Sequence, residues 1–336
     1  MLEINKIHNM DCITGMKQLE SETVHCCVTS PPYWSLRDYG VDGQIGLEET
    51  FDQYITKMVE VFREARRVLR KDGTLWLNLG DSYCSTAPGT MGDNIHIEGT
   101  KEATRRARKI LRPKTPYGLK PKDLMGIPWR VALALQADGW YLRSDIIWHK
   151  PSCMPDSVKD RPTKAHEYIF LLSKSSRYYY DYDAAKEPCV QDEFANGFRG
   201  GAYCNNSTFN NSTGGKRKKS GNIRRKYGED RDRPGSHLGA SIPWEGNTRN
   251  RRTVWTVATS RFPEAHFATY PPKLIEPCIL AGCPKDGVVL DPFMGSGTTA
   301  MVALQHQRNF IGFELNPEYI RIAEEHRLSK VQMQIV

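Results

Sequence analysis

A serine, two prolines and a tyrosine, Ser30 to Tyr33, follow a short run of apolar and small residues, and Trp34 comes next. The two prolines fix the backbone and remove two N–H donors, so the segment offers carbonyl acceptors and little conformational freedom. An aromatic residue after a strand usually packs in the core, but two prolines argue against that role here. The pattern indicates a rigid loop that presents polar acceptors and aromatic side chains to a ligand.

A second segment with possible chemistry, Gly287 to Tyr319, reads as a strand, a glycine-rich loop, a helix and a strand that ends at Glu314. Gly295 and Gly297 let the backbone approach a ligand closely. A carboxylate at the end of the second strand can accept both hydroxyls of a ribose. The loop lacks the third glycine of the dinucleotide fingerprint and the lysine of a phosphate-binding loop. A nucleoside without a pyrophosphate fits better, and S-adenosylmethionine is such a ligand.

The chain is moderately basic, with 47 Lys and Arg against 39 Asp and Glu, a formal charge of +8. The basic residues gather in runs at 101–122, 216–219 and 224–226. One such run is usually a solvated loop, but several in one chain favour a nucleic acid, because they release its counterions. The nine cysteines form no CxxC pair, and no signal peptide or membrane-spanning run is evident. A cytoplasmic protein without a metal site or membrane contact is expected.

The Ser-Pro-Pro-Tyr tetrad and the later Asp-Pro-Phe-Met-Gly-Ser-Gly-Thr-Thr loop closely resemble the motifs of the amino-methylating DNA methyltransferases. The order, with the tetrad first and the cofactor loop last, is that of their β group. The resemblance implies that Ser30, Pro31, Pro32 and Tyr33 form the catalytic loop. It implies that S-adenosylmethionine is held by Asp11, His266, Phe267, Ala268, Asp291, Pro292, Phe293, Gly295, Ser296, Gly297, Thr298 and Glu314.

The chemistry implied by this resemblance suits the tetrad. An exocyclic amine inside a duplex must be flipped out of the stack, and Tyr33 offers a face on which the flipped base can lie. The Ser30 hydroxyl and the Pro31 carbonyl can accept hydrogen bonds from the amine and direct its nitrogen lone pair toward the methyl group. Neither a metal nor a covalent intermediate is needed. The DNA contacts expected are Trp34, Arg37, Lys216, Arg217, Lys218 and Lys219.

The first tetrad residue bears on the target base. In the family, Ser is usual for cytosine N4, and Asp or Asn for adenine N6. Cytosine N3 lies beside the amine and is more basic than adenine N1, and a hydroxyl can donate to it whereas a carboxylate cannot. The sequence therefore favours N4-methylcytosine, with adenine-N6 methylation as the alternative.

Three further alternatives concern the class of protein. Carbon-5 methylation needs a cysteine after a proline at a strand end, and Pro188-Cys189 and Pro277-Cys278 do not follow the tetrad strand. RNA methylation would use the same chemistry, and a nucleic-acid-binding module could retain the fold without turnover. The partners expected are double-stranded DNA and a cognate restriction endonuclease, and the chain is expected to be a monomer or a homodimer.

The elements that must position these residues alternate between strands and helices, which predicts an α/β fold with a largely parallel sheet. Seven strands are expected, within 5–10, 24–30, 73–80, 141–148, 167–173, 287–293 and 309–315. Helices are expected over 51–70, 124–139, 298–305 and 317–332, with Asp72-Gly73 ending the first.

Two polar regions, residues 82–121 and 181–252, interrupt the alternation of strands and helices. The resemblance implies that the rest of the chain forms a circularly permuted, Rossmann-like seven-stranded sheet. Residues 1–180 would form its catalytic half, with a basic loop over 82–121, and residues 253–336 its cofactor-binding half. Residues 181–252 lie where the family keeps its target-recognition domain and are too long for an ordinary connection.

Overall fold

The computed structural model describes residues 2–84, 118–153, 155–188, 248–259, 270–329 and 331. The chain divides into a larger unit, Met1–Lys186 with Asn250–Val336, and a smaller unit, Glu187–Arg249. In the smaller unit, strands β6 (Glu187–Pro188) and β7 (Thr248–Arg249) pair antiparallel. Most of the predicted basic loop and the basic runs of the insertion lie outside the described residues.

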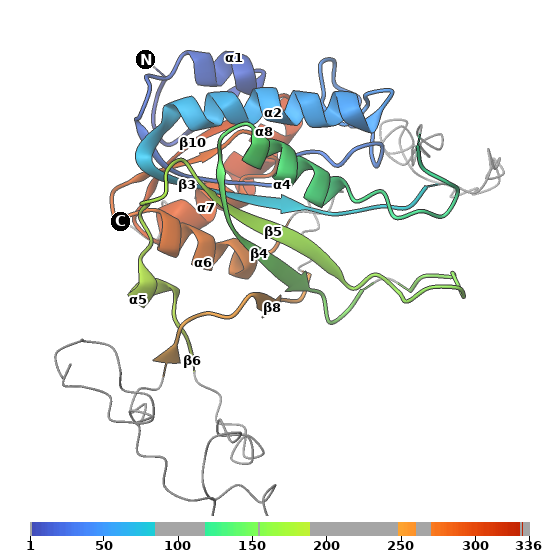
Figure 1. Ribbon diagram of the computed structural model, residues 1–336. Helices are drawn as coiled ribbons and strands as arrows, with labels where there is room; N and C mark the ends of the chain where they lie inside the picture. Colours follow the sequence, from blue (N-terminus) through green and yellow to red (C-terminus); the bar gives the residue numbers. More distant parts are fainter. Residues whose placement is uncertain are drawn as a thin grey trace, which may run out of the picture. The chain divides into compact units, whose positions relative to one another are not determined.

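A sheet of eight strands, in the order β1-β10-β9-β2-β3-β5-β4-β8, forms the middle layer of the larger unit (Figure 1). The strands are β1 (Lys6–Asn9), β2 (Val24–Thr29), β3 (Leu69–Leu79), β4 (Tyr141–His149), β5 (His166–Ser173), β8 (Val254–Thr256), β9 (Val288–Asp291) and β10 (Asn309–Glu314). Strand β5 runs antiparallel to both of its neighbours, and the other pairings in this sheet are parallel. The α/β prediction is confirmed. The short edge strand β8 adds an eighth strand to the seven expected.

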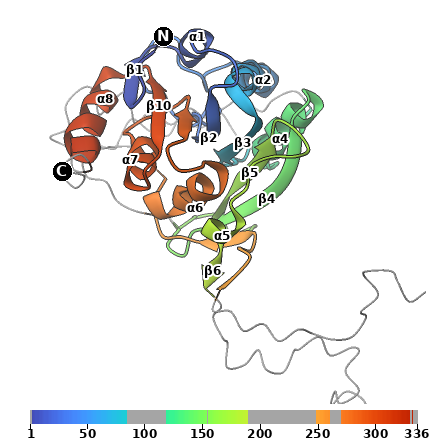
Figure 2. The same cartoon turned by 90° about the vertical axis from the view of Figure 1, so that its left-hand side faces the viewer.

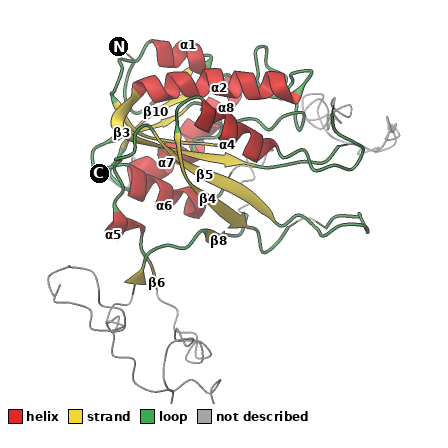
Figure 3. Cartoon of the chain, viewed as in Figure 1, coloured by secondary structure: helices red, strands yellow, loops and turns green. Residues whose placement is uncertain are grey.

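Helices cover both faces of the sheet (Figures 2 and 3). One face packs against α1 (Cys12–Lys17), α2 (Phe51–Val68) and α4 (Ile127–Ala137). The other packs against α6 (Pro272–Gly282), α7 (Thr298–Gln305) and α8 (Pro317–Ala323), which continues into a π-helical turn, Glu324–Leu328. A short helix, α5 (Tyr182–Ala185), lies near α6. None of the helices in the described ranges has the length and apolarity to cross a bilayer.

The two cores show how the strand sequence sorts its side chains. Side chains along a strand alternate between faces, so neighbouring Cys26 and Cys27 of β2 belong to different cores. Both cysteines are fully buried. A strand buried on both faces needs a nearly continuous apolar run, and that is why this segment was recognisable in the sequence.

Helix α2 begins where the sequence provides a capping box. The Thr50 side chain accepts from the Gln53 N–H, and the Gln53 side chain accepts from the Thr50 N–H, each at 3.2 Å. The helix ends at Val68, because Leu69 is extended and already belongs to β3. The predicted helix, 51–70, therefore extends two residues too far, because Leu69 and Arg70 already belong to β3.

The parallel strands bring their carboxyl ends to one edge of the sheet. Asn9 lies opposite Glu314, Gly312 opposite Asp291, and Cys27 opposite Leu290. The loops that follow β2, β9 and β10 therefore meet at that edge, which is where open α/β sheets bind ligands.

The capping box gives a test of local stability. Replacing Thr50 with Ala removes one capping acceptor and should lower the free energy of unfolding by about 1 kcal/mol. Thr56→Ala is the control, because this mid-helix hydroxyl bonds only a carbonyl of its own helix, Asp52 O. Denaturant unfolding should separate the two variants; equal stability would show that the cap contributes little.

Candidate active site

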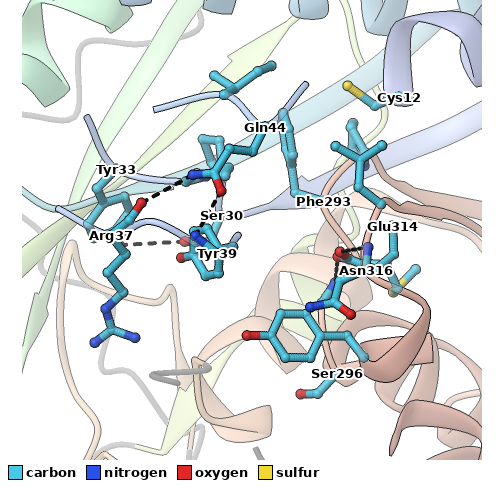
Figure 4. A pocket seen from close by; sticks show the side chains of 18 of the residues that line it. Cys12, Ser30, Tyr33, Arg37, Tyr39, Gln44, Phe293, Ser296, Glu314 and Asn316 are labelled. Atoms are coloured by element: carbon cyan, nitrogen blue, oxygen red, sulfur yellow. Dashed lines mark hydrogen bonds between the residues drawn. The ribbon is translucent and has the colours of Figure 1, made fainter. Parts of the chain in front are cut away.

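A cavity of about 440 Å³ opens at the carboxyl edge of the parallel strands (Figure 4). Two loops separated by more than 250 residues of sequence line it together, the tetrad loop and the glycine-rich loop. The predicted site residues that line it are Asp11, Ser30, Pro31, Pro32, Tyr33, Arg37, Pro292, Phe293, Gly295, Ser296, Thr298 and Glu314. The volume lies within the range of small-molecule and cofactor sites.

Glu314 is held in place by backbone donors. One carboxylate oxygen accepts from the Gly295 N–H at 2.8 Å, and the other accepts from the Asn316 N–H at 2.8 Å. Burial raises the pKa of Glu314, and the two backbone hydrogen bonds oppose that rise. The carboxylate is thus oriented before any ligand arrives and keeps lone pairs for ligand hydroxyls, as the ribose role requires.

The glycines of the loop are required by its geometry. Gly295 and Gly297 both have positive φ, at 53° and 80°. At Gly297 an added Cβ would also lie 2.7 Å from the Cβ of Ala323. Gly297 therefore starts helix α7 in a left-handed conformation that a larger residue would strain. Gly297 shapes the loop but does not line the cavity.

Asp291 stabilises the loops of the site without facing the cavity. It is fully buried and does not line the cavity. Its carboxylate accepts from the hydroxyls of Thr29 at 2.6 Å, Tyr270 at 3.0 Å and Thr299 at 2.5 Å, and from the Phe293 N–H at 3.0 Å. Burial raises the pKa of Asp291, while these hydrogen bonds lower it. In the structure Asp291 shapes the cofactor loop rather than facing a ligand.

The Ser296 hydroxyl indicates that a polar ligand group fits the part of the cavity formed by the glycine-rich loop. Ser296 is 3% exposed and lines the cavity, and its hydroxyl has no hydrogen-bond partner among the described residues. A buried hydroxyl without a partner is costly. The neighbouring Thr298 hydroxyl is already bonded to the Arg327 guanidinium. The Ser296 hydroxyl is therefore available to a polar group of a bound ligand.

Asp11 follows β1 and caps α1. Its carboxylate accepts from the N–H of Thr14 at 2.9 Å and from the Thr14 hydroxyl at 3.1 Å. It also lines the cavity. The cap fixes the carboxylate at the edge of the cavity where the cofactor is predicted to bind.

The tetrad loop is immobilised around Tyr33. The Tyr33 hydroxyl lies 2.7 Å from a carboxylate oxygen of Glu167 and 3.2 Å from the Asn78 carbonyl oxygen. An added Cβ at Gly80 would lie 2.6 Å from the Tyr33 ring, so this glycine lets the ring pack onto the end of β3. The Pro32 carbonyl accepts from the Tyr54 hydroxyl at 2.9 Å. Tyr33 therefore offers more than the ring face expected from the sequence, because its hydroxyl is also held by hydrogen bonds.

The structure corrects the prediction for Trp34 and leaves Arg37 at the cavity. Trp34 is 3% exposed, its indole donates to the Glu48 carbonyl at 2.9 Å, and its ring meets Phe51 edge-on. A side chain this deeply packed is a core residue, not a DNA contact. Arg37 is half-buried and lines the cavity, and Gln44 bonds its carbonyl.

Several residues at the site were not predicted from the sequence. On the tetrad side these are Asn78, Lys150 and Glu167, and on the cofactor side Tyr39, Asn316 and Tyr319. The Tyr39 and Tyr319 rings meet edge-on at 6.5 Å, which joins the loop after the tetrad to α8. The one available signal was the polar Glu167 near the start of the apolar strand β5. Two of its partners, Asn78 and Tyr33, lie 89 and 134 positions away in the chain, beyond the reach of local patterns.

Other predicted residues lie outside the described ranges. These are His266, Phe267 and Ala268 of the cofactor set, and Lys216, Arg217, Lys218 and Lys219 of the DNA set. From the same segment as His266, Tyr270 is described and lines the cavity while it bonds Asp291.

Carbon-5 methylation requires a nucleophilic cysteine. Among the described residues, Cys12 is the one cysteine that lines the cavity. Burial raises the pKa of Cys12 to about 12, so it is a poor nucleophile. Cys278, one of the two candidates from the sequence, is fully buried in α6 and away from the cavity lining. The other, Cys189, lies outside the described residues.

Comparison with known proteins identifies the family. Residues 24–325 match the family described as DNA methylase. The Type II methyltransferase M.Cfr9I of Citrobacter freundii is 46% identical over 324 residues, covering 96% of this chain and 88% of that protein.

Two solved structures share the fold. The PvuII DNA methyltransferase (cytosine-N4-specific) matches with a TM-score of 0.58 at 17% identity, covering 98% of this chain and 90% of that one. TTHA0409 of Thermus thermophilus, solved in complex with S-adenosyl-L-methionine, matches with a TM-score of 0.54 at 20% identity, covering 97% of this chain and 95% of that one.

The chain therefore belongs to the family of DNA methylases that modify N6 or N4 amines. Its fold is the Rossmann-like methyltransferase fold, its methyl donor is S-adenosylmethionine, and it acts on DNA. The resemblance seen in the sequence is confirmed.

The geometry around Glu314 gives a test of the cofactor site. Glu314→Ala should weaken S-adenosylmethionine binding by about ten- to a hundredfold, because a partly buried, charge-assisted contact is worth roughly 1.5–3 kcal/mol. In the wild type, affinity should also fall as the pH decreases. The ionised form accepts the hydroxyls, and a raised pKa starts this loss at a higher pH than for an exposed glutamate. Calorimetric titration measures both effects.

Glu318→Ala is the matched control, since this glutamate is 56% exposed, pairs with Arg321 and does not line the cavity. Equal affinities for the two variants and the wild type would remove Glu314 from the cofactor site.

Proposed function

We propose that the protein transfers the methyl group of S-adenosylmethionine to the exocyclic N4 amine of a cytosine flipped out of duplex DNA. The observation that carries the proposal is that Ser30 and Tyr33 share one cavity with the glycine-rich loop and Glu314. A cofactor at one end would present its methyl group to a base at the other. This is the proximity that a direct displacement needs.

The tetrad residues have distinct roles in this proposal. Tyr33 supports the flipped base by stacking. Ser30 and the Pro31 carbonyl accept hydrogen bonds from the two hydrogens of the amine. The nitrogen lone pair, otherwise delocalised into the ring, then turns toward the methyl group. As the C–S bond breaks and the N–C bond forms, the acceptors face a nitrogen that is becoming positive, so they stabilise the transition state more than the ground state. The sulfur leaves with the C–S electron pair as a neutral thioether, and the methylated amine then loses one proton to water.

The choice of cytosine rests on Ser30. A serine places one neutral oxygen beside the amine. An aspartate would place a negatively charged oxygen near the lone pair of cytosine N3, which is more basic than adenine N1. Adenine-N6 methylation is the second candidate, and the family includes both reactions.

The biological setting proposed is restriction–modification, because the relative from Citrobacter freundii is a Type II methyltransferase. Site-specific methylation then protects DNA from a partner endonuclease. The region 181–252 is proposed to read the target sequence, because a long polar insertion in the sequence of a catalytic domain is suited to contacts with base edges, while its basic runs hold the phosphates.

The product tests the proposed function. Methylated DNA is digested to nucleosides, which are separated by chromatography and identified by mass spectrometry against standards; chromatography is needed because N4- and C5-methylcytosine have the same mass. N4-methylcytosine is expected. N6-methyladenine would refute the choice of base, and 5-methylcytosine would overturn the mechanism.

The role of Ser30 is tested by Ser30→Ala at saturating cofactor. The rate of methyl transfer should fall on the order of 10²–10³-fold, as for the loss of one preorganised electrostatic partner, while cofactor affinity stays unchanged. Ser144→Ala is the control, because its hydroxyl bonds only a neighbouring carbonyl and does not line the cavity. A wild-type rate for Ser30→Ala would exclude the serine from the reaction.

The role of the insertion is tested by replacing Lys216, Arg217, Lys218 and Lys219 with Ala. Duplex binding should weaken alike for specific and unrelated sequences, and the salt dependence should flatten by about one unit of slope for each phosphate that is no longer neutralised. An unchanged salt slope would show that this run does not contact DNA.

A further inference from the structure

The hydrogen bonds around the Tyr33 hydroxyl fix which group donates and which accepts, and the tetrad sequence alone does not specify this. Tyr33, Asn78, Lys150 and Glu167 lie together at one end of the cavity and all four line it. They come from the tetrad loop, β3, the residue after β4, and β5. Glu167 is only 15% exposed in its side chain, so its charge must be balanced within the protein.

Glu167 is satisfied at both oxygens. One oxygen pairs with the Lys150 ammonium, which also lies 4.2 Å from the centre of the Trp148 ring. The other accepts from the Tyr33 hydroxyl at 2.7 Å and from the Asn78 amide at 3.3 Å. Lys150 therefore neutralises the carboxylate and at the same time leaves its second oxygen facing Tyr33.

Two acceptors surround the Tyr33 hydroxyl. The Asn78 amide donates to the Tyr168 carbonyl at 3.0 Å, so its own oxygen faces Tyr33, at 3.2 Å. The carboxylate oxygen of Glu167 is closer to the Tyr33 hydroxyl, and it is charged. The Tyr33 hydroxyl therefore donates its hydrogen bond to Glu167. Burial and the charge of Glu167 both raise the pKa of Tyr33, so the hydroxyl keeps the proton that it donates.

The third neighbour of the Tyr33 hydroxyl is Ser30. The two oxygens are 3.5 Å apart, the longest contact in the group, with Ser30 donating. Since the Tyr33 proton is directed to Glu167, only a lone pair of Tyr33 is left for Ser30. The serine proton then points to Tyr33, and the lone pairs of Ser30 are left for a ligand.

We propose that Glu167 is a positioning residue that sets the direction of the hydrogen bonds from Ser30 through Tyr33 and thereby presents the Ser30 hydroxyl to the target amine as an acceptor. The inference rests on the proposed function, in which that amine is the donor. It also replaces the expectation that Ser30 donates to cytosine N3. It explains why the tetrad ends in Tyr rather than Phe, since a phenylalanine would break the chain of hydrogen bonds.

The substitution Glu167→Gln tests this direction with little change in shape. Lys150 can only donate, so it keeps the amide oxygen, and the amide N–H₂ turns toward Tyr33. The Tyr33 proton is then shared between Asn78 and Ser30, and Ser30 no longer presents lone pairs alone. At saturating cofactor, the single-turnover rate of methyl transfer should fall by about ten- to a hundredfold, while S-adenosylmethionine affinity is unchanged.

A double-mutant cycle distinguishes this role from a merely structural one. If Glu167 acts through Ser30, Glu167→Gln should have little further effect in a Ser30→Ala background, and the same should hold in a Tyr33→Phe background. Glu22→Gln is the matched control, since Glu22 pairs with Lys174 at 3.5 Å away from the cavity and should leave the rate unchanged.

The outcomes separate this inference from the proposed function. Multiplicative effects of Glu167→Gln and Ser30→Ala, or a wild-type rate for Glu167→Gln, would overturn the role of Glu167 while leaving Ser30 in the reaction. A wild-type rate for Ser30→Ala would instead exclude Ser30 from the proposed reaction, and the identity of the methylated product tests the proposed function separately. The cycle measures transfer to whichever amine is methylated, so an adenine product would refute the choice of cytosine without obscuring the coupling.

Discussion

The site depends on one buried hydrogen bond, from the Thr29 hydroxyl to the Asp291 carboxylate, 2.6 Å long. Thr29 is the last residue of β2 and immediately precedes the tetrad, and Asp291 is the last residue of β9 and immediately precedes the glycine-rich loop. The bond therefore joins the two loops that must present an amine and a methyl group to each other. The same carboxylate also accepts hydrogen bonds from Tyr270 and Thr299. One carboxylate therefore connects the tetrad loop, the cofactor loop and the segment before α6.

The site keeps three carboxylates at low exposure, and each is compensated in a different way. Asp291 has no cation among its hydrogen-bond partners in the described chain and is stabilised by hydroxyls and a backbone N–H. Glu314 relies on two backbone N–H groups and keeps capacity for a ligand. Glu167 has a cation, Lys150, and uses its second oxygen to orient Tyr33. The first shapes a loop, the second awaits a ligand, and the third gives direction to the reacting end, so burial of charge is matched to function in each case.

Sequence patterns predicted what local chemistry determines. All seven expected strands are present, because strands buried on both faces need continuous apolar runs, and α7 spans 298–305 as expected, because Gly297 fixes its start. The patterns failed where tertiary contacts decide. The aromatic pattern could not distinguish Trp34, packed on Phe51, from Tyr33 at the cavity. No role could be assigned to Glu167 or Lys150 from the sequence, because their role arises only when β4 and β5 lie beside the tetrad. Strand β8, three residues long, has too short a pattern to be recognised.

Thr29→Val tests whether the Thr29–Asp291 bond keeps the two loops in register for methyl transfer. This change keeps the shape of the residue and removes the hydroxyl, while Asp291 retains its other three partners. The measurement is the single-turnover rate of methyl transfer at saturating S-adenosylmethionine, where weaker cofactor binding cannot affect the result. If the bond holds the two loops in register, the rate should be well below that of the wild type in a protein that remains folded. A wild-type rate under these conditions would contradict this role, because the tetrad would then be positioned without the bond.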